Sequence, residues 1–341
     1  MNKYILKKEK IAEALKALAT TGVVYIPVKN KRGLVEYREL GKDASVSEIK
    51  LDCKPDVPPK GILFPQTEVL FTFKEMGGKI TVTPVKIEDQ EKIIFGAKPC
   101  DAIAITLLDK VFCEGKFTDS YYKARREKLT VFTIACDGPA DSTCFCPSTG
   151  GSPAATGGSD VMMYDVGDSY YAEGITDKGR KILEALKGQL GKPNSAQEKR
   201  KEEIIKKAES AEGFTRKITE ESIGKLDSSF DSKYWDDIAR RCLSCGACTY
   251  YCPTCHCFDI NDEAGNKRVR TWDSCQFSNF TMHTSSHNPR TGKAQKLRNR
   301  YYHKFKYSKE NIGRYLCVGC GRCIALCPVG LDITKAISEV K

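Results

Sequence analysis

The stretch that decides the fold reads CLSCGACTYYCP, from Cys242 to Pro253. Its cysteines have the spacing C-x2-C-x2-C-x3-C, and a proline follows the last one. A second stretch, CVGCGRCIALCP, repeats the pattern from Cys317 to Pro328 without an error. Two such runs in one chain indicate a paired metal-binding module.

This spacing is that of the two-cluster bacterial ferredoxins, in which each run holds one [4Fe–4S] cluster. Three close thiolates bind one cluster, and the fourth cysteine, carried away by the proline, ligates the other. Small residues at Gly246, Gly319 and Gly321 allow the backbone to approach the cluster. The crossover predicts two ligand sets: Cys242, Cys245, Cys248 and Cys327, and then Cys317, Cys320, Cys323 and Cys252. Zinc ribbons are the alternative, but they use two C-x2-C pairs and fit three evenly spaced cysteines poorly.

The remaining composition agrees with a metalloprotein in a reducing compartment. The chain has 341 residues, 17 of them cysteine, and a net charge of +11 from 55 basic and 44 acidic residues. This length predicts about two domains. No segment approaches the length of a membrane helix, and the first residues lack the apolar run of a signal peptide. We therefore expect a cytoplasmic protein whose thiols serve metals or catalysis.

The distribution of the cysteines predicts the domain organisation. Eleven of the 17 lie after residue 241, which separates a cysteine-rich C-terminal part from the rest. Residues 1–190 alternate apolar runs such as Ile62–Phe64 and Leu129–Ile134 with turns and helical patterns, so we predict an α+β domain there. We predict that residues 191–235 form a charged linker. For residues 236–341 we predict a mainly α-helical, ferredoxin-like domain with two [4Fe–4S] clusters. The reason is that the 64 residues between the two cysteine runs resemble the insertion of α-helical ferredoxins.

A third group of cysteines lies in the N-terminal part. Its members occur at apparent strand ends or in loops, where ligands are usually mounted: Cys100, Cys136, Cys144 and Cys146. Four thiols suffice for a third [4Fe–4S] cluster, but their spacing is not a standard run. A third cluster, a zinc ion and simple structural thiols therefore remain open alternatives. Cys53 and Cys113 look like ordinary core or surface residues.

Three further thiols accompany the first run, at Cys255, Cys257 and Cys275. No fourth partner is evident, so we interpret them as buried thiols beside a cluster, with a further metal site as the alternative. His283 and His287 are four residues apart and could share a helix face, but no third ligand accompanies them, which favours a structural role.

The segment from Pro289 to Lys309 is strongly basic. It holds eight lysines and arginines, no acid and four aromatic residues. Such a segment could bind nucleic acid. We favour instead a role near the clusters, whose thiolates carry net negative charge, or in docking an acidic partner. We find neither a dinucleotide fingerprint nor a phosphate loop.

Motifs along most of the chain resemble one family, the iron–sulfur β subunits of archaeal sulfhydrogenases and the similar A subunits of anaerobic sulfite reductases. The motifs are LFPQTE at 63–68, GAKPCD at 96–101, YYKARRE at 121–127, TCFC at 143–146, WDSC at 272–275 and LRNRYYHK at 297–304. The cluster runs occur in many ferredoxin domains, so these other motifs narrow the family.

The resemblance implies an electron-transfer subunit of a multi-subunit anaerobic oxidoreductase. It implies one partner with FAD and a [2Fe–2S] cluster that exchanges hydride with NAD(P)H, and a catalytic partner such as a hydrogenase, a sulfite reductase or a heterodisulfide-reductase-like protein. It implies no catalytic residue in this chain. The rival hypothesis is a redox enzyme whose N-terminal cluster has an open iron site. A metal-stabilised nucleic-acid binder is a third and remote hypothesis.

Overall fold

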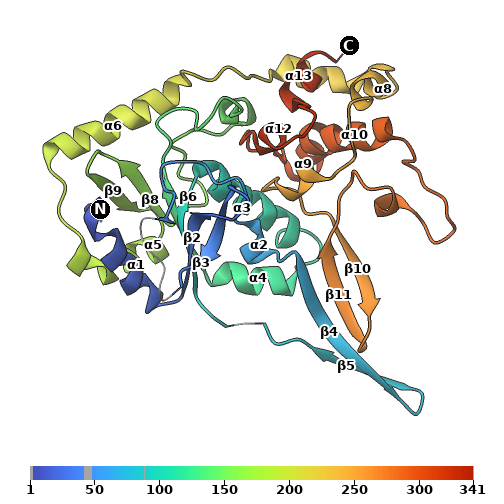
Figure 1. The fold of residues 1–341 in the computed structure, drawn as a ribbon, viewed down its shortest axis with the longest axis horizontal. Helices are drawn as coiled ribbons and strands as arrows, with labels where there is room; N and C mark the ends of the chain where they lie inside the picture. Colours follow the sequence, from blue (N-terminus) through green and yellow to red (C-terminus); the bar gives the residue numbers. More distant parts are fainter. Residues whose placement is uncertain (1–2, 42–47, 88, 341) are drawn as a thin grey trace. The chain divides into compact units, whose positions relative to one another are not determined.

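The computed structural model describes residues 3–41, 48–87 and 89–340. The chain forms two compact units, each assembled from segments that are distant in sequence (Figure 1). The first unit comprises the described residues of 1–59, 89–217 and 317–321, and the second those of 60–88, 218–316 and 322–341. The predicted domain limits at residues 190 and 235 stay a prediction.

A seven-stranded mixed sheet forms the centre of the first unit. The strands follow the order β1 (Lys3–Lys7), β9 (Ser169–Gly174), β8 (Val161–Asp165), β7 (Leu129–Ile134), β6 (Lys92–Ala97), β2 (Val23–Lys29) and β3 (Val35–Glu39). The four strands β2, β6, β7 and β8 are parallel, and the remaining pairings are antiparallel. Every residue of β6 and β7 is buried, as expected for parallel strands covered on both faces.

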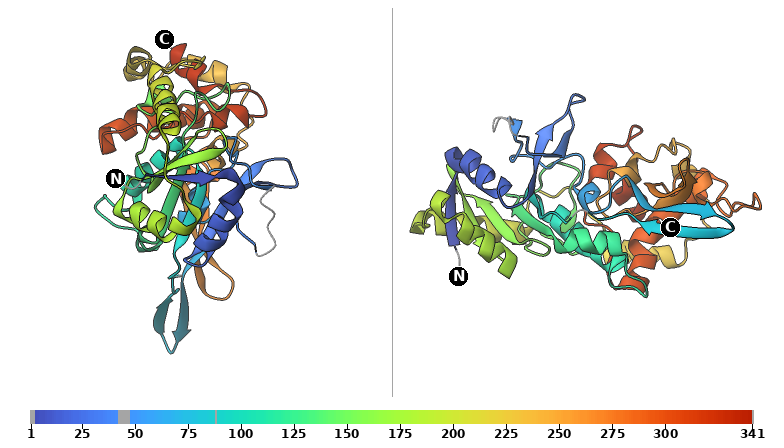
Figure 2. Two further views of the ribbon diagram at one scale, coloured as in Figure 1. Left: turned by 90° about the vertical axis from the view of Figure 1, so that its left-hand side faces the viewer. Right: turned by 90° about the horizontal axis from the view of Figure 1, so that it is seen from below.

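Helices cover both faces of this sheet. Helices α1 (Ile11–Ala19) and α5 (Asp177–Ala185) pack with Phe132 of β7 in one hydrophobic core. Helix α6 (Ser195–Ser210) contributes Ile204 to a separate core with Met162 of β8. Val161 and Met163 belong to the first core, so alternate side chains of β8 point to opposite faces, as a strand requires. Figure 2 shows this sheet from two further directions.

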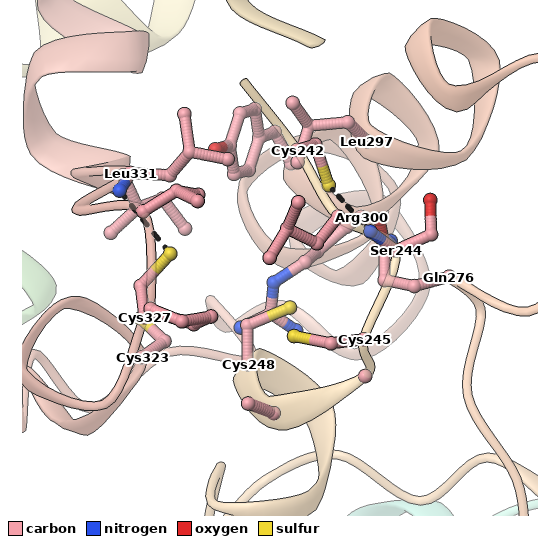
Figure 3. A pocket seen from close by; sticks show the side chains of 17 residues that line it. Cys242, Ser244, Cys245, Cys248, Gln276, Leu297, Arg300, Cys323, Cys327 and Leu331 are labelled. Atoms are coloured by element: carbon pink, nitrogen blue, oxygen red, sulfur yellow. Dashed lines mark hydrogen bonds between the residues drawn. The ribbon is translucent and has the colours of Figure 1, made fainter. Parts of the chain in front are cut away.

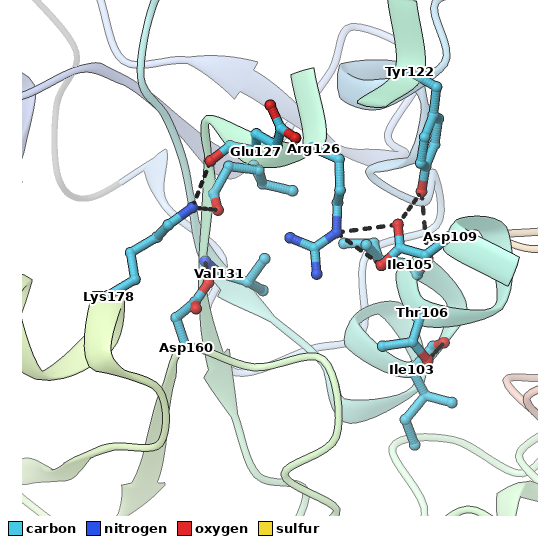
Figure 4. Close-up of polar contacts among 11 residues, drawn as sticks. Ile103, Ile105, Thr106, Asp109, Tyr122, Arg126, Glu127, Val131, Asp160 and Lys178 are labelled. Carbon is cyan, nitrogen blue, oxygen red and sulfur yellow. Dashed lines mark hydrogen bonds and ion pairs between the residues drawn. The ribbon is translucent and has the colours of Figure 1, made fainter. Parts of the chain in front are cut away.

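The first turn of helix α3 (Pro99–Phe112) carries Cys100, and contacts further along the helix fix its position. Helix α4 (Ser120–Glu127) places the Tyr122 hydroxyl 2.8 Å from Asp109 and the Arg126 guanidinium 2.9 Å from the same carboxylate (Figure 4). The Tyr122 ring also stacks on Phe112 at 4.7 Å between centroids. Because Tyr122 is fully buried, these contacts fix α3 and, with it, Cys100 in its first turn.

A four-stranded antiparallel sheet and several short helices form the second unit. The sheet order is β10 (Phe258–Glu263), β11 (Lys267–Trp272), β4 (Thr67–Met76) and β5 (Lys79–Pro84). A buried ion pair between Arg270 and Glu68, 2.5 Å long, joins β11 to β4. The helices are α2 (Lys60–Leu63), α7 (Glu220–Gly224), α8 (Tyr234–Ala239), α9 (Ala247–Tyr250), α10 (Lys293–Tyr302), α11 (Ser308–Ile312), α12 (Arg322–Ala325) and α13 (Ile333–Ser338).

The mixed α and β content predicted from the sequence is confirmed. The mainly α-helical character predicted for residues 236–341 is not confirmed, since β10 and β11 lie within this range. The apolar run Ile62–Phe64, which we counted with the strand-like runs, begins inside helix α2, and the Phe64 amide donates to the Lys60 carbonyl. Three apolar residues cannot distinguish a buried strand from a buried helical turn. Among the described residues, no helix is long and apolar enough to cross a membrane.

Candidate functional site

The first predicted ligand set converges on one pocket of the second unit. Cys242, Cys245, Cys248 and Cys327 all line it, between the start of α9 and the end of α12 (Figure 3). Apolar residues, among them Leu297 and Leu331, complete the wall. The structure therefore brings together four thiols that lie up to 85 positions apart in the sequence, since 327 − 242 = 85.

Backbone groups in this pocket are arranged for sulfur ligands. The Ser244 amide donates to the Cys242 sulfur at 3.3 Å, and the Leu331 amide donates to the Cys327 sulfur at 3.2 Å. Gly246 has a φ of +75°, and a Cβ there would lie 2.8 Å from the Phe277 ring. Glycine is therefore required between the second and third cysteines of the run. Amide donors to thiolates stabilise negative charge on sulfur, which suits an iron–sulfur cluster.

The second predicted ligand set is divided between the two compact units. Cys317 and Cys320 belong to the first unit, and Cys323 and Cys252 belong to the second. This set therefore stays a prediction. Cys323 also lines the pocket of the first set.

The surroundings of Cys252 favour a thiolate. The Lys304 ammonium donates to its sulfur at 3.2 Å, and the Thr254 hydroxyl lies 3.3 Å from it. A hydrogen bond with Cys255, together with the charges of Lys304 and Arg300, holds the pKa of Cys252 below its usual range against the opposing effect of burial. A thiolate is the form that binds metals.

The four N-terminal cysteines also converge. Cys100, Cys136, Cys144 and Cys146 line one pocket of the first unit, together with Cys320. Cys100 follows β6 and Cys136 follows β7, and because these strands are parallel neighbours, their carboxyl ends lie at the same sheet edge. The loop after β7 adds the other two thiols.

Two cations face this N-terminal pocket, Lys54 and Lys98. The Lys54 ammonium lies 3.4 Å from the Cys144 sulfur and 2.7 Å from the Asp141 carboxylate. Burial would raise the pKa of Asp141, but the charge of Lys54 and hydrogen bonds from Lys54 and Thr143 hold it at about 2. The carboxylate is therefore ionised and offsets the charge of Lys54.

The chemistry of this donor set fits a metal. Burial, followed by the neighbouring charges of Cys136 and Cys144, raises the pKa of Cys146 to about 12. Burial also raises the pKa of Cys136. Without a metal these thiols stay protonated at neutral pH, and a bound metal would displace the protons.

Residues of the second run form part of the first unit. The Phe145 amide donates to the Gly319 carbonyl at 2.7 Å. Gly319 has a φ of +60°, and a Cβ there would lie 2.5 Å from the backbone nitrogen of Cys146. The glycine therefore allows the loop that carries Cys144 and Cys146 to pack against the backbone between Cys317 and Cys320.

Comparisons with known proteins place the chain in a family. The family model for the 4Fe–4S dicluster domain matches residues 241–331. The chain is 30% identical over 342 aligned positions to sulfhydrogenase 2 subunit beta of Pyrococcus furiosus, covering 98% of this chain and 97% of that subunit. This chain belongs to the sulfhydrogenase beta-subunit family. The family resemblance that the sequence motifs predict is therefore confirmed.

Three more thiols, those of Cys255, Cys257 and Cys275, belong to the same unit as Cys252. Cys257 directly precedes β10, and Asp273 directly follows β11. Because β10 and β11 pair antiparallel, these two residues lie side by side, and the Asp273 amide donates to the Cys257 carbonyl at 3.0 Å. A hydrogen bond with Cys257 lowers the pKa of Cys275 to about 6 although burial opposes this. Cys255 accepts a hydrogen bond from Arg300 at 3.2 Å. The interpretation of these thiols as cluster neighbours stays a prediction.

Buried cations beside the thiols are a feature that sequence reasoning did not single out residue by residue. Lys296, Arg300 and Lys304 recur every four residues in the basic segment, and each is 3–4% exposed. A spacing of four is the signal that places them on one helix face. Burial would lower the pKa of Arg300, but the charges of four cysteines, Cys248, Cys255, Cys323 and Cys252, raise it well above its usual value.

The other predicted candidates have different surroundings. His283 and His287 do not share a helix face, a possibility that their spacing left open: residues 282–288 are not helical, and the His283 amide donates to the His287 carbonyl at 2.8 Å across a turn. The structural role predicted for them stays a prediction. The turn includes Ser286, whose φ of +64° is incompatible with a continuing helix. Cys53 and Cys113 line neither pocket. Among the described residues, no three His, Cys, Asp or Glu side chains are grouped so as to hold a single metal ion.

Proposed function

We propose that this iron–sulfur subunit relays single electrons within a multi-subunit oxidoreductase. Its donor or acceptor on one side is a subunit with flavin and a [2Fe–2S] cluster that exchanges hydride with NAD(P)H. On the other side is a catalytic subunit, such as a hydrogenase, a sulfite reductase or a heterodisulfide-reductase-like protein. The expected location is the cytoplasm. The observation that carries the proposal is the convergence of Cys242, Cys245, Cys248 and Cys327 on one pocket.

The protein's own residues bind and insulate the clusters in this proposal. A [4Fe–4S] cluster supplies a one-electron couple at a potential that its surroundings adjust. The four cysteines of the first set would hold one cluster, while Leu297 and Leu331 limit the access of water. The second set, Cys317, Cys320, Cys323 and Cys252, would hold another, with Lys304 neutralising thiolate charge at Cys252.

A third cluster at Cys100, Cys136, Cys144 and Cys146 is part of the proposal. Support comes from the common pocket of all four thiols and from the cations beside it. The rival hypothesis of catalysis at an open iron site needs an iron without a cysteine ligand. Convergence of four cysteines supports full ligation instead, and therefore electron transfer.

The proposal is tested by purifying the chain anaerobically from its native host and identifying the subunits that accompany it. We expect a flavoprotein and a catalytic oxidoreductase subunit in stoichiometric amounts. Iron and acid-labile sulfide are measured on the same sample, and two clusters require about eight irons per chain, three about twelve. Fewer than about eight irons after anaerobic reconstitution would contradict the two-cluster proposal. Turnover by the isolated subunit would favour the rival hypothesis.

A further inference from the structure

The guanidinium of Arg300 is buried, and one of its nitrogens has no hydrogen-bond acceptor among the described residues. The residue lies on α10 and is 3% exposed. Its Nη1 donates to the Cys255 sulfur at 3.2 Å, whereas Nη2 is buried and has no hydrogen-bond partner among the described residues. A buried charged donor without an acceptor is strongly unfavourable, so the site is built for an acceptor that binds there.

The pocket of the first ligand set is where this donor points. Arg300 lines that pocket together with Cys242, Cys245, Cys248 and Cys327, and Figure 3 shows its side chain reaching in among them. Two neutral oxygens without a hydrogen-bond partner in the described part of the chain, Gln276 Oε1 and Ser244 Oγ, belong to residues that line this pocket. The negatively charged acceptors that it offers are sulfur atoms, either cysteine thiolates or the sulfides of a bound cluster. Both carry negative charge and accept hydrogen bonds from a guanidinium.

We propose that Arg300 is a positioning residue that raises the reduction potential of the cluster at Cys242, Cys245, Cys248 and Cys327. Its free Nη2 donates to a sulfur atom of that cluster, while Cys255 holds the guanidinium in place through Nη1. This gives Cys255 a role as an anchor of the arginine rather than as an iron ligand. The inference rests on the proposed function, because it requires a cluster in this pocket.

The direction of the effect follows from charge. Accepting one electron adds one negative charge to the cluster, and a fixed cation stabilises that more negative state. No bond forms or breaks and no proton is needed, since the guanidinium stays protonated in both states. The pocket is partly apolar, so the attraction is less screened than it would be in water.

The test is an anaerobic redox titration of the reconstituted full chain, followed by electron paramagnetic resonance. In Arg300→Gln we expect the one-electron reduction equilibrium of one cluster to shift at least about tenfold toward the oxidised form, which is about 59 mV lower in potential. Cys245→Ser changes a ligand of the same cluster and so identifies its signal. Arg298→Gln is the matched control, because Arg298 lies on the same helix but packs its guanidinium 3.6 Å from the Phe230 ring centre.

Two further variants separate charge from hydrogen bonding. Arg300→Lys keeps the charge but loses the second nitrogen, so we expect a smaller lowering of the potential. Cys255→Ala removes the anchor and should lower the same potential without loss of iron. If Arg300→Gln does not retain iron, Cys255→Ala decides the matter, and an unchanged potential in that variant overturns the inference.

The outcomes distinguish this inference from the proposed function. Wild-type protein without iron at this pocket would contradict the proposed function itself. Wild-type protein with a full complement of iron, combined with an unchanged potential in an iron-loaded Arg300→Gln variant, would overturn only the role of Arg300. An equal shift in Arg298→Gln would also overturn it, because the effect would then not depend on the pocket.

Discussion

The pocket of Cys242 and the pocket of Cys144 each place a buried cation beside thiols, but the two cations have different neighbours. The charges that most favour the Arg300 guanidinium are those of cysteines. The Lys54 ammonium lies beside Cys144 and also forms an ion pair with Asp141 at 2.7 Å. The carboxylate offsets much of the Lys54 charge, but Lys98 also lines this pocket, so two pockets with five cysteines each differ in how charge is arranged beside the thiols. We therefore expect the potential of the N-terminal cluster to depend on the balance among Lys54, Lys98 and Asp141.

The comparison fails if the N-terminal pocket binds no cluster, so the largest expected effect concerns iron content. Cys146→Ala should lower the iron content by about four per chain, because it removes one ligand of a cubane cluster. The measurement is iron and sulfide per chain after anaerobic reconstitution. Cys113→Ala is the control, since Cys113 lies outside both pockets. Equal iron in wild type and Cys146→Ala would remove the third cluster from the proposal.

A second change should damage one pocket and spare the other. Gly319→Ala puts a Cβ 2.5 Å from the backbone of Cys146 at a φ of +60°, and we expect a loss of about 3 kcal/mol from strain and overlap. Gly77→Ala is matched in backbone conformation, with a φ of +57°, but has no atom within 4 Å of the new Cβ. That control should lose only about 1 kcal/mol.

The readouts for this pair are anaerobic urea unfolding and the resonance signals of the clusters. Gly319→Ala should weaken the signal of the N-terminal cluster while the signal marked by Cys245→Ser is retained. The close packing of residues 317–321 in the first unit would be refuted if both glycine variants were equally stable.

The smallest expected effect tests the charge balance directly. Asp141→Asn removes the carboxylate beside Lys54, so the lysine charge should raise the potential of the N-terminal cluster, shifting its reduction equilibrium about tenfold, or about 59 mV. Asp165→Asn is the control, because Asp165 forms an ion pair of similar length but greater exposure with Lys8 and lines neither pocket. Redox titration measures both variants. A lowered potential in Asp141→Asn would contradict the expected effect of the carboxylate on the charge beside the N-terminal pocket.

The sequence predicts the first cluster site well because its information is local. Three of the four ligands lie within seven residues, from Cys242 to Cys248, and the proline after Cys252 signals the exchange of the fourth ligand. The N-terminal cysteines could be proposed because Cys100 and Cys136 follow apparent strands. Only the structure shows that these strands are parallel neighbours.

The remaining features depend on long-range packing, which no local pattern contains. The basic segment after Pro289 was recognised, but its composition does not tell a buried Arg300 from a half-buried Arg290. Lys54 has no motif at all, and its role depends on the distant Asp141 and Cys144. The short helix at Lys60–Leu63 was mistaken for a strand-like run because three apolar residues carry no period.

The inclusion of residues 317–321 in the first unit has a consequence for biosynthesis. Translation proceeds from the N-terminus, so the strands of the seven-stranded sheet are synthesised by Gly174, whereas one wall of its cysteine pocket is synthesised only with residues 317–321. Any cluster placed in the N-terminal pocket before that point would lie open on the side that Gly319 and Cys320 later cover. Iron–sulfur insertion into this pocket is therefore expected to follow the synthesis of residues 317–321.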